Sequence, residues 1–105
     1  MMEHEDLCSK VEKGFELIGK RWTGLIIFVL MNGPKRFSEL HTSIPDLSKR
    51  MLTERVKELE ENGILVRHMV NERPIRVEYL LTKKGTELGK ILRPIGEWAT
   101  NWIKE

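Results

Sequence analysis

The fold is set by residues 37–81, which read FSELHTSIPDLSKRMLTERVKELEENGILVRHMVNERPIRVEYLL. Apolar residues recur at helical spacing over 37–43 and again over 48–62, where Ser48 is a favourable N-cap. Pro45 ends the first helix, because proline disfavours helical geometry at the residue before it. The sequence therefore predicts a short helix, a tight turn and a longer helix. The buried face of the longer helix comprises Leu52, Val56 and Leu59.

Two runs rich in strand-forming residues follow directly, ILVRHMV at 64–70 and IRVEYLL at 75–81. The polar insert 71–74 separates them, so the two runs predict one antiparallel hairpin. A short helix, a turn, a longer helix and a hairpin, in this order, make a helix-turn-helix with a wing. We expect a mainly α-helical fold with a small β-hairpin, a winged helix-turn-helix with terminal dimerisation helices.

Three further helices are predicted around this unit. Ser9 and Glu12 have the spacing of a capping box, which predicts a first helix that ends near Gly19. A second, strongly apolar helix covers 21–32. Thr82 is the candidate N-cap of a last helix that runs to the C-terminus. The apolar face of the second helix comprises Trp22, Leu25, Ile26, Val29 and Leu30.

The composition is that of one soluble domain over residues 1–105, with 40% hydrophobic and 32% charged residues. The longest apolar stretch, 25–31, is far shorter than the roughly 20 residues that a membrane span needs. The N-terminus MMEHEDLCSK is acidic where a signal peptide would be basic, and a single cysteine excludes an intramolecular disulfide. We therefore expect a cytoplasmic protein with no membrane segment.

The net charge of +2 conceals an uneven distribution along the chain. Residues 1–16 carry two basic and five acidic groups, residues 20–57 carry eight basic and three acidic groups, and residues 58–105 carry eight of each. A segregated basic block is a candidate footprint for nucleic acid, although a surplus of this size is often only a solvated surface.

The solvent side of the helix over 48–62 carries residues suited to a DNA major groove. Arg can donate two hydrogen bonds to guanine, Thr can contact a thymine methyl group or a phosphate, and Lys neutralises phosphates. Further basic residues lie between the second and third helices and at the hairpin tip. The candidate DNA-binding residues are Lys35, Arg36, Ser48, Lys49, Arg50, Thr53, Arg55, Lys57, Arg73 and Arg76.

Each of these basic clusters also has a plainer interpretation. Amphipathic helices with a charged outer face are common, and a pair such as Arg50 with Glu54 would support one. Arg at a hairpin tip can serve solubility alone, and Glu72 offsets part of the charge there. DNA binding requires the clusters to converge on one side of the molecule, which a winged helix makes possible.

The sequence contains none of the motifs that would indicate an enzyme. The three histidines are isolated, and HExxH, CxxC, GxGxxG and a nucleophile elbow are all absent from the sequence. Gly14, Gly19 and Gly24 recur at intervals of five and indicate close helix packing rather than a phosphate-binding loop. We therefore expect no catalytic activity, no cofactor and no metal site.

The sequence resembles the HxlR-type helix-turn-helix transcriptional regulators of bacteria, which are relatives of the MarR group. The resemblance runs from about Cys8 to Trp102. Its matching blocks are FELIGKRWTGLIIFVLMNGPKRFSEL at 15–40, SKRMLTERVKELEENGIL at 48–65 and PIRVEYLLTKKG at 74–85. The resemblance implies a homodimer that binds a pseudo-palindromic operator in double-stranded DNA. The helix over 48–62 would enter the major groove, with the hairpin over 64–81 as the wing.

The resemblance also implies that the terminal helices build the dimer interface. Apolar residues of the last helix alternate steps of three and four, like heptad a and d positions, and make a wide apolar face. Pro94 predicts a kink or a break near 91–93. The alternative is that this helix only covers the core of the monomer. The candidate interface residues are Leu88, Ile91, Leu92, Ile95, Trp98, Ala99 and Trp102.

Cys8 is a candidate sensor of oxidants or electrophiles, because some members of the resembled family use a cysteine at this position in that way. A thiol just before a helix N-terminus can have a lowered pKa, but the nearby Glu3, Glu5 and Asp6 oppose a thiolate. The alternative is a packed, structural cysteine.

Besides a simple DNA-binding regulator, two other functions fit the sequence. The first is a DNA-binding regulator that is switched through Cys8, and the second is a winged helix that binds proteins without sequence-specific DNA binding. The sequence indicates no inducer.

Overall fold

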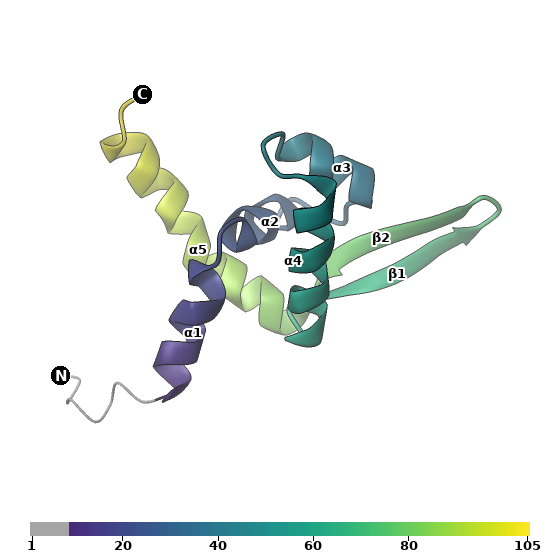
Figure 1. The fold of residues 1–105 in the computed structure, drawn as a ribbon, viewed down its shortest axis with the longest axis horizontal. Helices are drawn as coiled ribbons and strands as arrows, with labels where there is room; N and C mark the ends of the chain where they lie inside the picture. The colour runs from purple at the N-terminus through teal and green to yellow at the C-terminus, as the bar shows by residue number, and fades with distance from the viewer. Residues whose placement is uncertain (1–8) are drawn as a thin grey trace.

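The computed structural model describes residues 9–105 and confirms the predicted winged helix-turn-helix. Its elements are α1 (Ser9–Gly19), α2 (Thr23–Leu30), α3 (Phe37–Ser43), α4 (Lys49–Glu61), β1 (Leu65–Glu72), β2 (Ile75–Leu81) and α5 (Lys83–Trp102). Helices α3 and α4 lie beside α2, the hairpin projects to one side, and α5 extends to the other (Figure 1). None of the described helices is long and apolar enough to span a membrane.

The core lies where α2, α3 and α4 meet the base of the hairpin and the first half of α5. It is built from aliphatic side chains that are nearly or fully buried, and the predicted inner face of α4 is part of it. The core residues are Ile26, Ile27, Leu30, Leu40, Ile44, Leu47, Leu52, Val56, Leu59, Ile64, Leu65 and Leu92.

The ends of α2 and its buried face differ from the prediction. The helix begins at Thr23 because Trp22 has a left-handed backbone, with a φ of 80°. Leu25 is 51% exposed, whereas Ile27, absent from the predicted face, is fully buried. Almost every residue of α2 is apolar, so the sequence pattern could not indicate which side of the helix faces the core.

The hairpin is longer than the two predicted runs. β1 extends to Glu72, and the register shifts between Met69 and Asn71, which leaves an extra residue in the strand. The turn is therefore only Arg73 and Pro74. The insert 71–74 predicts a four-residue connection because its polar residues and proline are typical of loops.

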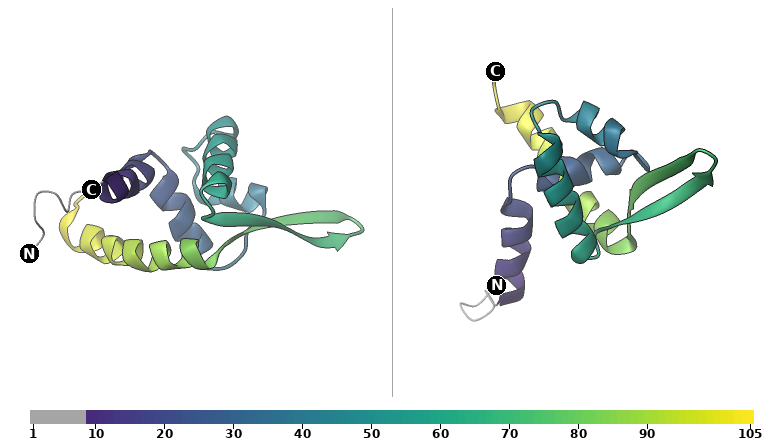
Figure 2. Two further views of the ribbon diagram at one scale, coloured as in Figure 1. Left: turned by 90° about the horizontal axis from the view of Figure 1, so that it is seen from below. Right: turned by 45° about the vertical axis from the view of Figure 1, so that its right-hand side comes forward.

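α5 is one continuous helix, so of the kink or break predicted near 91–93 the break is excluded. Pro94 lies inside the helix, and Figure 2 shows the helix curving along its length. Pro94 is exposed, so water can satisfy the carbonyl left without its helical partner.

The predicted packing role of the early glycines is also wrong. A Cβ atom added at Gly14, Gly19 or Gly24 would meet nothing within 4 Å. The close approaches are instead made by α5, where a Cβ at Gly85 would lie 2.0 Å from the backbone oxygen of Ile64, and one at Gly89 would lie 2.3 Å from the sulfur of Met31. These glycines seat the first half of α5 against the domain.

Candidate nucleic-acid interface

The N-terminal part of α4 is fixed by its cap and by its buried face. Ser48 is the N-cap, and its Oγ accepts a hydrogen bond from the backbone N of Met51 at 3.1 Å. The buried side of α4 then dictates which side chains face solvent. Lys49, Arg50, Thr53 and Lys57 are all exposed on α4.

A short β-bridge brings two of the basic clusters together. Lys35 pairs with Tyr79 of β2 through two backbone hydrogen bonds. The backbone N of Lys35 donates to the O of Tyr79 at 3.0 Å, and the N of Tyr79 donates to the O of Lys35 at 2.7 Å. The segment Lys35–Arg36 is thereby fixed against the wing. Lys35 is half-buried, whereas Arg36, Arg73 and Arg76 are exposed.

Glu39 lies among these cations. Its carboxylate accepts a hydrogen bond from the backbone N of Arg36 at 2.8 Å and thereby caps α3. This hydrogen bond is the main cause that lowers the pKa of Glu39, and the charges of Arg36, Lys35 and Arg76 act in the same direction. Lys35, Arg36 and Arg76 therefore lie near enough to Glu39 for their charges to act on it.

We use the name recognition face for the candidate DNA-contacting residues, which are exposed except for the half-buried Lys35. Its members are Lys35, Arg36, Lys49, Arg50, Thr53, Lys57, Arg73 and Arg76. Among the ion pairs of residues 9–105, none joins Arg50 to Glu54, so the pairing expected of an ordinary charged helix is not formed there. The cation of Arg50 is free to meet an external partner.

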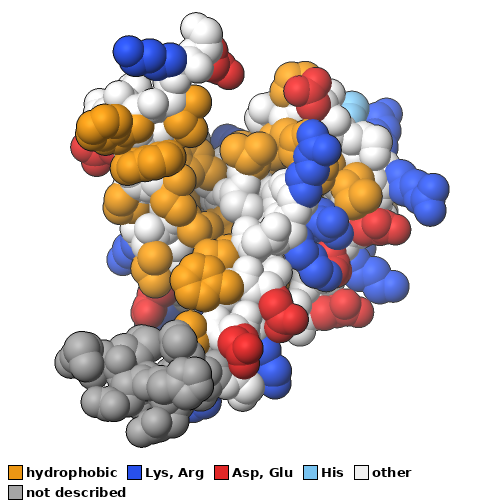
Figure 3. All heavy atoms as spheres, turned by 60° about the vertical axis from the view of Figure 1, so that its left-hand side comes forward, with side chains coloured by type: hydrophobic (Ala, Val, Ile, Leu, Met, Phe, Trp, Pro, Cys, Tyr) orange, Lys and Arg blue, Asp and Glu red, His pale blue; other side chains and the backbone are white. Residues whose placement is uncertain are grey.

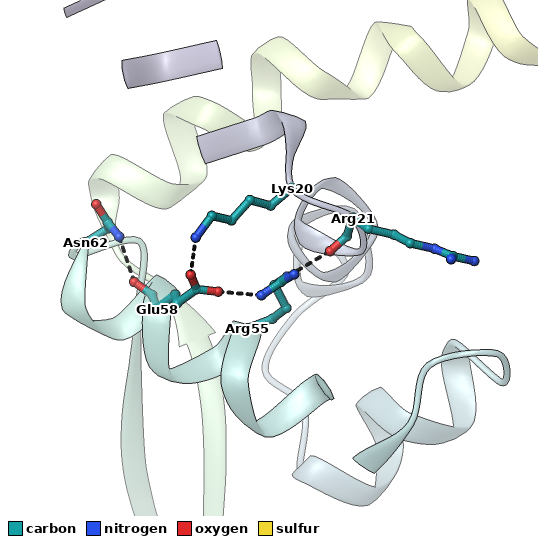
Figure 4. Close-up of polar contacts among 5 residues, drawn as sticks. All are labelled: Lys20, Arg21, Arg55, Glu58 and Asn62. Atoms are coloured by element: carbon teal, nitrogen blue, oxygen red, sulfur yellow. Dashed lines mark hydrogen bonds and ion pairs between the residues drawn. The ribbon is translucent and has the colours of Figure 1, made fainter. Parts of the chain in front are cut away.

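Arg55 differs from the other candidates because its side chain points to the interior of the molecule. Its Nε donates to the backbone oxygen of Arg21 at 2.9 Å, and its Nη1 donates to Glu58 at 2.7 Å. The side chain is only 17% exposed. The close-up in Figure 4 shows it between α4 and the segment that joins α1 to α2, together with Lys20, which also pairs with Glu58.

A second surface is apolar. The outer stripe of α5 continues onto the exposed side of α2, and we call this surface the apolar face. Its members are Leu25, Phe28, Ile91, Ile95, Trp98 and Trp102. In Figure 3, hydrophobic side chains gather on one side of the view, while Lys and Arg gather on the other.

The predicted interface residues divide between this surface and the core. Ile91, Ile95, Trp98 and Trp102 are between 55% and 72% exposed, whereas Leu92 is 7% exposed and belongs to the core. A hollow of about 420 Å³ opens between the end of α1, α2 and α5. Ala99 lines it, and Leu88 packs against the core.

Sequence reasoning missed Leu25 and Phe28 as parts of an exposed apolar surface. The available signal was the composition of α2, because a helix that is apolar on all sides must be covered on all sides. The ion pair between Lys20 and Glu58 had no such signal, since the two residues are 38 positions apart. Cys8 lies outside the described residues.

These features define a winged helix-turn-helix protein. A sequence model of the HxlR-like helix-turn-helix family matches residues 17–105. The chain belongs to the HxlR-like helix-turn-helix family, and its predicted class of function, a helix-turn-helix transcriptional regulator, is confirmed.

Two relatives from Bacillus subtilis (strain 168) match over most of their length. The uncharacterized HTH-type transcriptional regulator YvaP is 47% identical over 102 residues, which cover 97% of this chain and 94% of YvaP. The HTH-type transcriptional regulator YodB is 52% identical over 98 residues, which cover 93% of this chain and 88% of YodB.

Solved structures of similar sequence share the fold. The reduced form of YodB superposes with a TM-score of 0.81 at 49% identity, over 92% of this chain and 95% of that chain. The oxidized form of the redox regulator HypR superposes with a TM-score of 0.85 at 34% identity, over 91% of this chain and 99% of that chain.

Proposed function

We propose that the protein binds a pseudo-palindromic operator in double-stranded DNA as a homodimer and regulates transcription from it. The bridge between Lys35 and Tyr79 supports this proposal most, because it joins the basic segment before α3 to the wing, while the exposed side of α4 carries the third basic cluster. This function would be exercised in the cytoplasm, where the DNA of a bacterial cell lies. No enzymatic activity is proposed.

The residues of the recognition face have different roles in this proposal. Arg50 and Thr53, near the start of α4, read base edges in the major groove, while Lys49 and Lys57 contact phosphates. Arg73 and Arg76 place the wing on the backbone or the adjacent minor groove. Ser48 acts through its backbone and its cap, because its hydroxyl already binds the N–H of Met51.

The apolar face supports the homodimer. Trp98 and Trp102 are 57% and 72% exposed. Exposure of these apolar residues to water is unfavourable, and their burial by a second copy would lower the free energy. To bind successive major grooves of a pseudo-palindrome, the two α4 helices of such a dimer must lie about 34 Å apart along the duplex, one helical turn.

Selection of bound sequences from a random pool of duplex DNA tests the function. The proposal predicts a pseudo-palindrome whose half-site centres are about 10 base pairs, or a multiple, apart. Recovery of no consensus sequence would contradict it and would favour a winged helix that binds proteins. The comparisons do not favour that alternative, since the named relatives are transcriptional regulators.

We also propose that Cys8 makes the regulator responsive to oxidants or electrophiles. The support is that YodB has been solved in reduced, diamide-treated and quinone-bound forms, and HypR in reduced and oxidized forms. Because the chain has one cysteine, a disulfide within the protein must join two protomers. Diamide would take two electrons and two protons from two Cys8 thiols to form it.

Cys8→Ser tests this response. Diamide or a quinone is expected to change the operator affinity of the wild type and to leave that of Cys8→Ser unchanged. Equal responses of the two proteins would contradict the role of Cys8.

A further inference from the structure

The segment that joins α1 to α2 is attached to the middle of α4 at two adjacent points. We call residues 20–22 the elbow. Lys20 pairs with one carboxylate oxygen of Glu58, and Arg55 pairs with the other at 2.7 Å. Arg55 also donates through Nε to the backbone oxygen of Arg21 at 2.9 Å. Figure 4 shows the resulting chain of contacts from the elbow to α4 and back to the elbow.

These contacts differ in kind from the apolar contacts of α4. Burial of Leu52, Val56 and Leu59 holds the helix on the core, but the hydrophobic effect has no directional preference. Charged hydrogen bonds are short and directional, so two of them at residues 55 and 58 oppose rotation and sliding of the helix. Side chains of this network are only 17% exposed at Arg55 and 29% at Glu58.

The elbow itself has an unusual backbone. Trp22 has a φ of 80°, which is rare for a bulky residue and persists only where the surroundings impose it. The peptide group between Arg21 and Trp22 defines this torsion, and its oxygen is the one that Arg55 holds. The guanidinium of Arg21 stacks on the Trp22 ring, 4.4 Å from its centroid. The conformation of the elbow and the position of α4 therefore depend on each other.

The network lies at the side of the recognition face and not within it. Arg55 and Glu58 come from α4 but point to the elbow, whereas Arg50, Thr53 and Lys57 of the same helix point to solvent. A base-reading helix needs its contact groups placed within about 0.5 Å, so a device that fixes the helix acts on sequence discrimination more than on general attraction to DNA.

We propose that Lys20, Arg55 and Glu58 are positioning residues for DNA recognition, which hold α4 at the angle at which it reads the operator. The inference rests on the proposed DNA-binding function. Lys20 and Trp22 also line the hollow on the apolar face, so a second copy that packed there would contact the elbow.

The test compares Glu58→Gln with Glu61→Gln, an exposed residue of the same helix. Affinities for the selected operator and for a scrambled duplex of equal length are measured by fluorescence anisotropy. Each variant loses one negative charge, so electrostatics alone would strengthen binding of both duplexes by both variants. The positioning role predicts that Glu58→Gln lowers the ratio of operator to scrambled affinity about tenfold, while Glu61→Gln preserves the ratio.

Lys20→Met provides a second route, because this side chain is 49% exposed and its polar contact in the described residues is the one with Glu58. The ratio should fall in Lys20→Met but fall no further when the same change is added to Glu58→Gln, since both act through one ion pair. A change in stability alone would shift the urea midpoint and leave the ratio unaltered.

The outcomes separate this inference from the function on which it rests. Failure of the wild type to distinguish operator from scrambled DNA would overturn both. Discrimination by the wild type, with an unchanged ratio in Glu58→Gln and in Lys20→Met, would overturn the positioning role alone.

Discussion

The two surfaces of this domain, the recognition face and the apolar face, differ in how they meet water. The cations of the recognition face are well hydrated, and their binding to a polyanion is favourable because it releases counterions from the polyanion. The indoles and aliphatic side chains of the apolar face lower the free energy of the system only when a partner buries them away from water. The difference teaches that one small domain presents two chemically distinct surfaces, which the proposed function assigns to DNA and to a second copy of the chain.

Trp98→Glu tests the apolar face and should have the largest effect of the variants considered. A buried carboxylate opposite its symmetry copy is unfavourable, so the variant should sediment as a monomer. Operator affinity should fall about a hundredfold or more, because two half-sites are no longer bound together. Asn101→Glu, an exposed position of α5 away from the stripe, is the control for added charge. A variant that remains dimeric would contradict the assignment of this face.

Arg50→Ala tests the recognition face directly. Loss of a paired hydrogen bond to a base should cost about 1–3 kcal/mol on the operator and relax the sequence requirement at one position of each half-site. Anisotropy titrations on the operator and on its point variants measure both effects. Lys90→Ala, an exposed cation of α5, should change neither.

Arg76→Ala tests the wing and should act differently from Arg50→Ala. It should weaken binding to all duplexes about equally and reduce the slope of log affinity against log salt by about one per protomer, since a phosphate contact is lost. A loss confined to the operator would instead mean that Arg76 reads bases.

Arg55→Lys tests whether Arg55 belongs to the recognition face. Lysine keeps the charge, but it lacks the two separate nitrogens, Nε and Nη1, through which Arg55 donates to Arg21 and to Glu58. We expect about a threefold loss of discrimination between operator and scrambled DNA, with the salt slope unchanged. A changed salt slope with full discrimination would indicate a direct phosphate contact.

Acid unfolding of Glu58→Gln should show the smallest effect. The hydrogen bond from Lys20 is the main cause that lowers the pKa of Glu58 below its ordinary 4.5; partial burial opposes it, and Arg55 adds to it. Above about pH 4.5, the wild type should therefore be more stable to unfolding than Glu58→Gln by about 0.5–1 kcal/mol. The advantage should disappear as the pH falls through the lowered pKa. Urea unfolding at several pH values measures it, and a difference that persists in acid would contradict this origin.

Much of the fold could be predicted because its signals are local. Ser48 caps α4 as expected, and Gly63, with a φ of 71°, follows its end. The spacing of Leu52, Val56 and Leu59 alone predicts the exposed side of the helix, and these three residues are buried. Where the sequence was uniform, as in the apolar α2, periodicity carried no information about direction.

The candidate site could be predicted only as separate clusters. The bridge that joins Lys35 to Tyr79 connects residues 44 positions apart, and backbone pairing of this kind leaves no mark on residue type. Charge and helix position alone place Arg55 among the candidate DNA-binding residues. Its partners, Glu58 and the carbonyl of Arg21, became visible only when the elbow was placed against α4.

The salt dependence of operator binding tests the central claim most directly. In anisotropy titrations from roughly 50 to 300 mM salt, a dimer that uses two recognition faces should give a slope of log affinity against log salt of about −5 or steeper. It should also retain a preference for the operator over a scrambled duplex at each salt concentration. An affinity that is independent of salt, or equal for the two duplexes, would contradict the account.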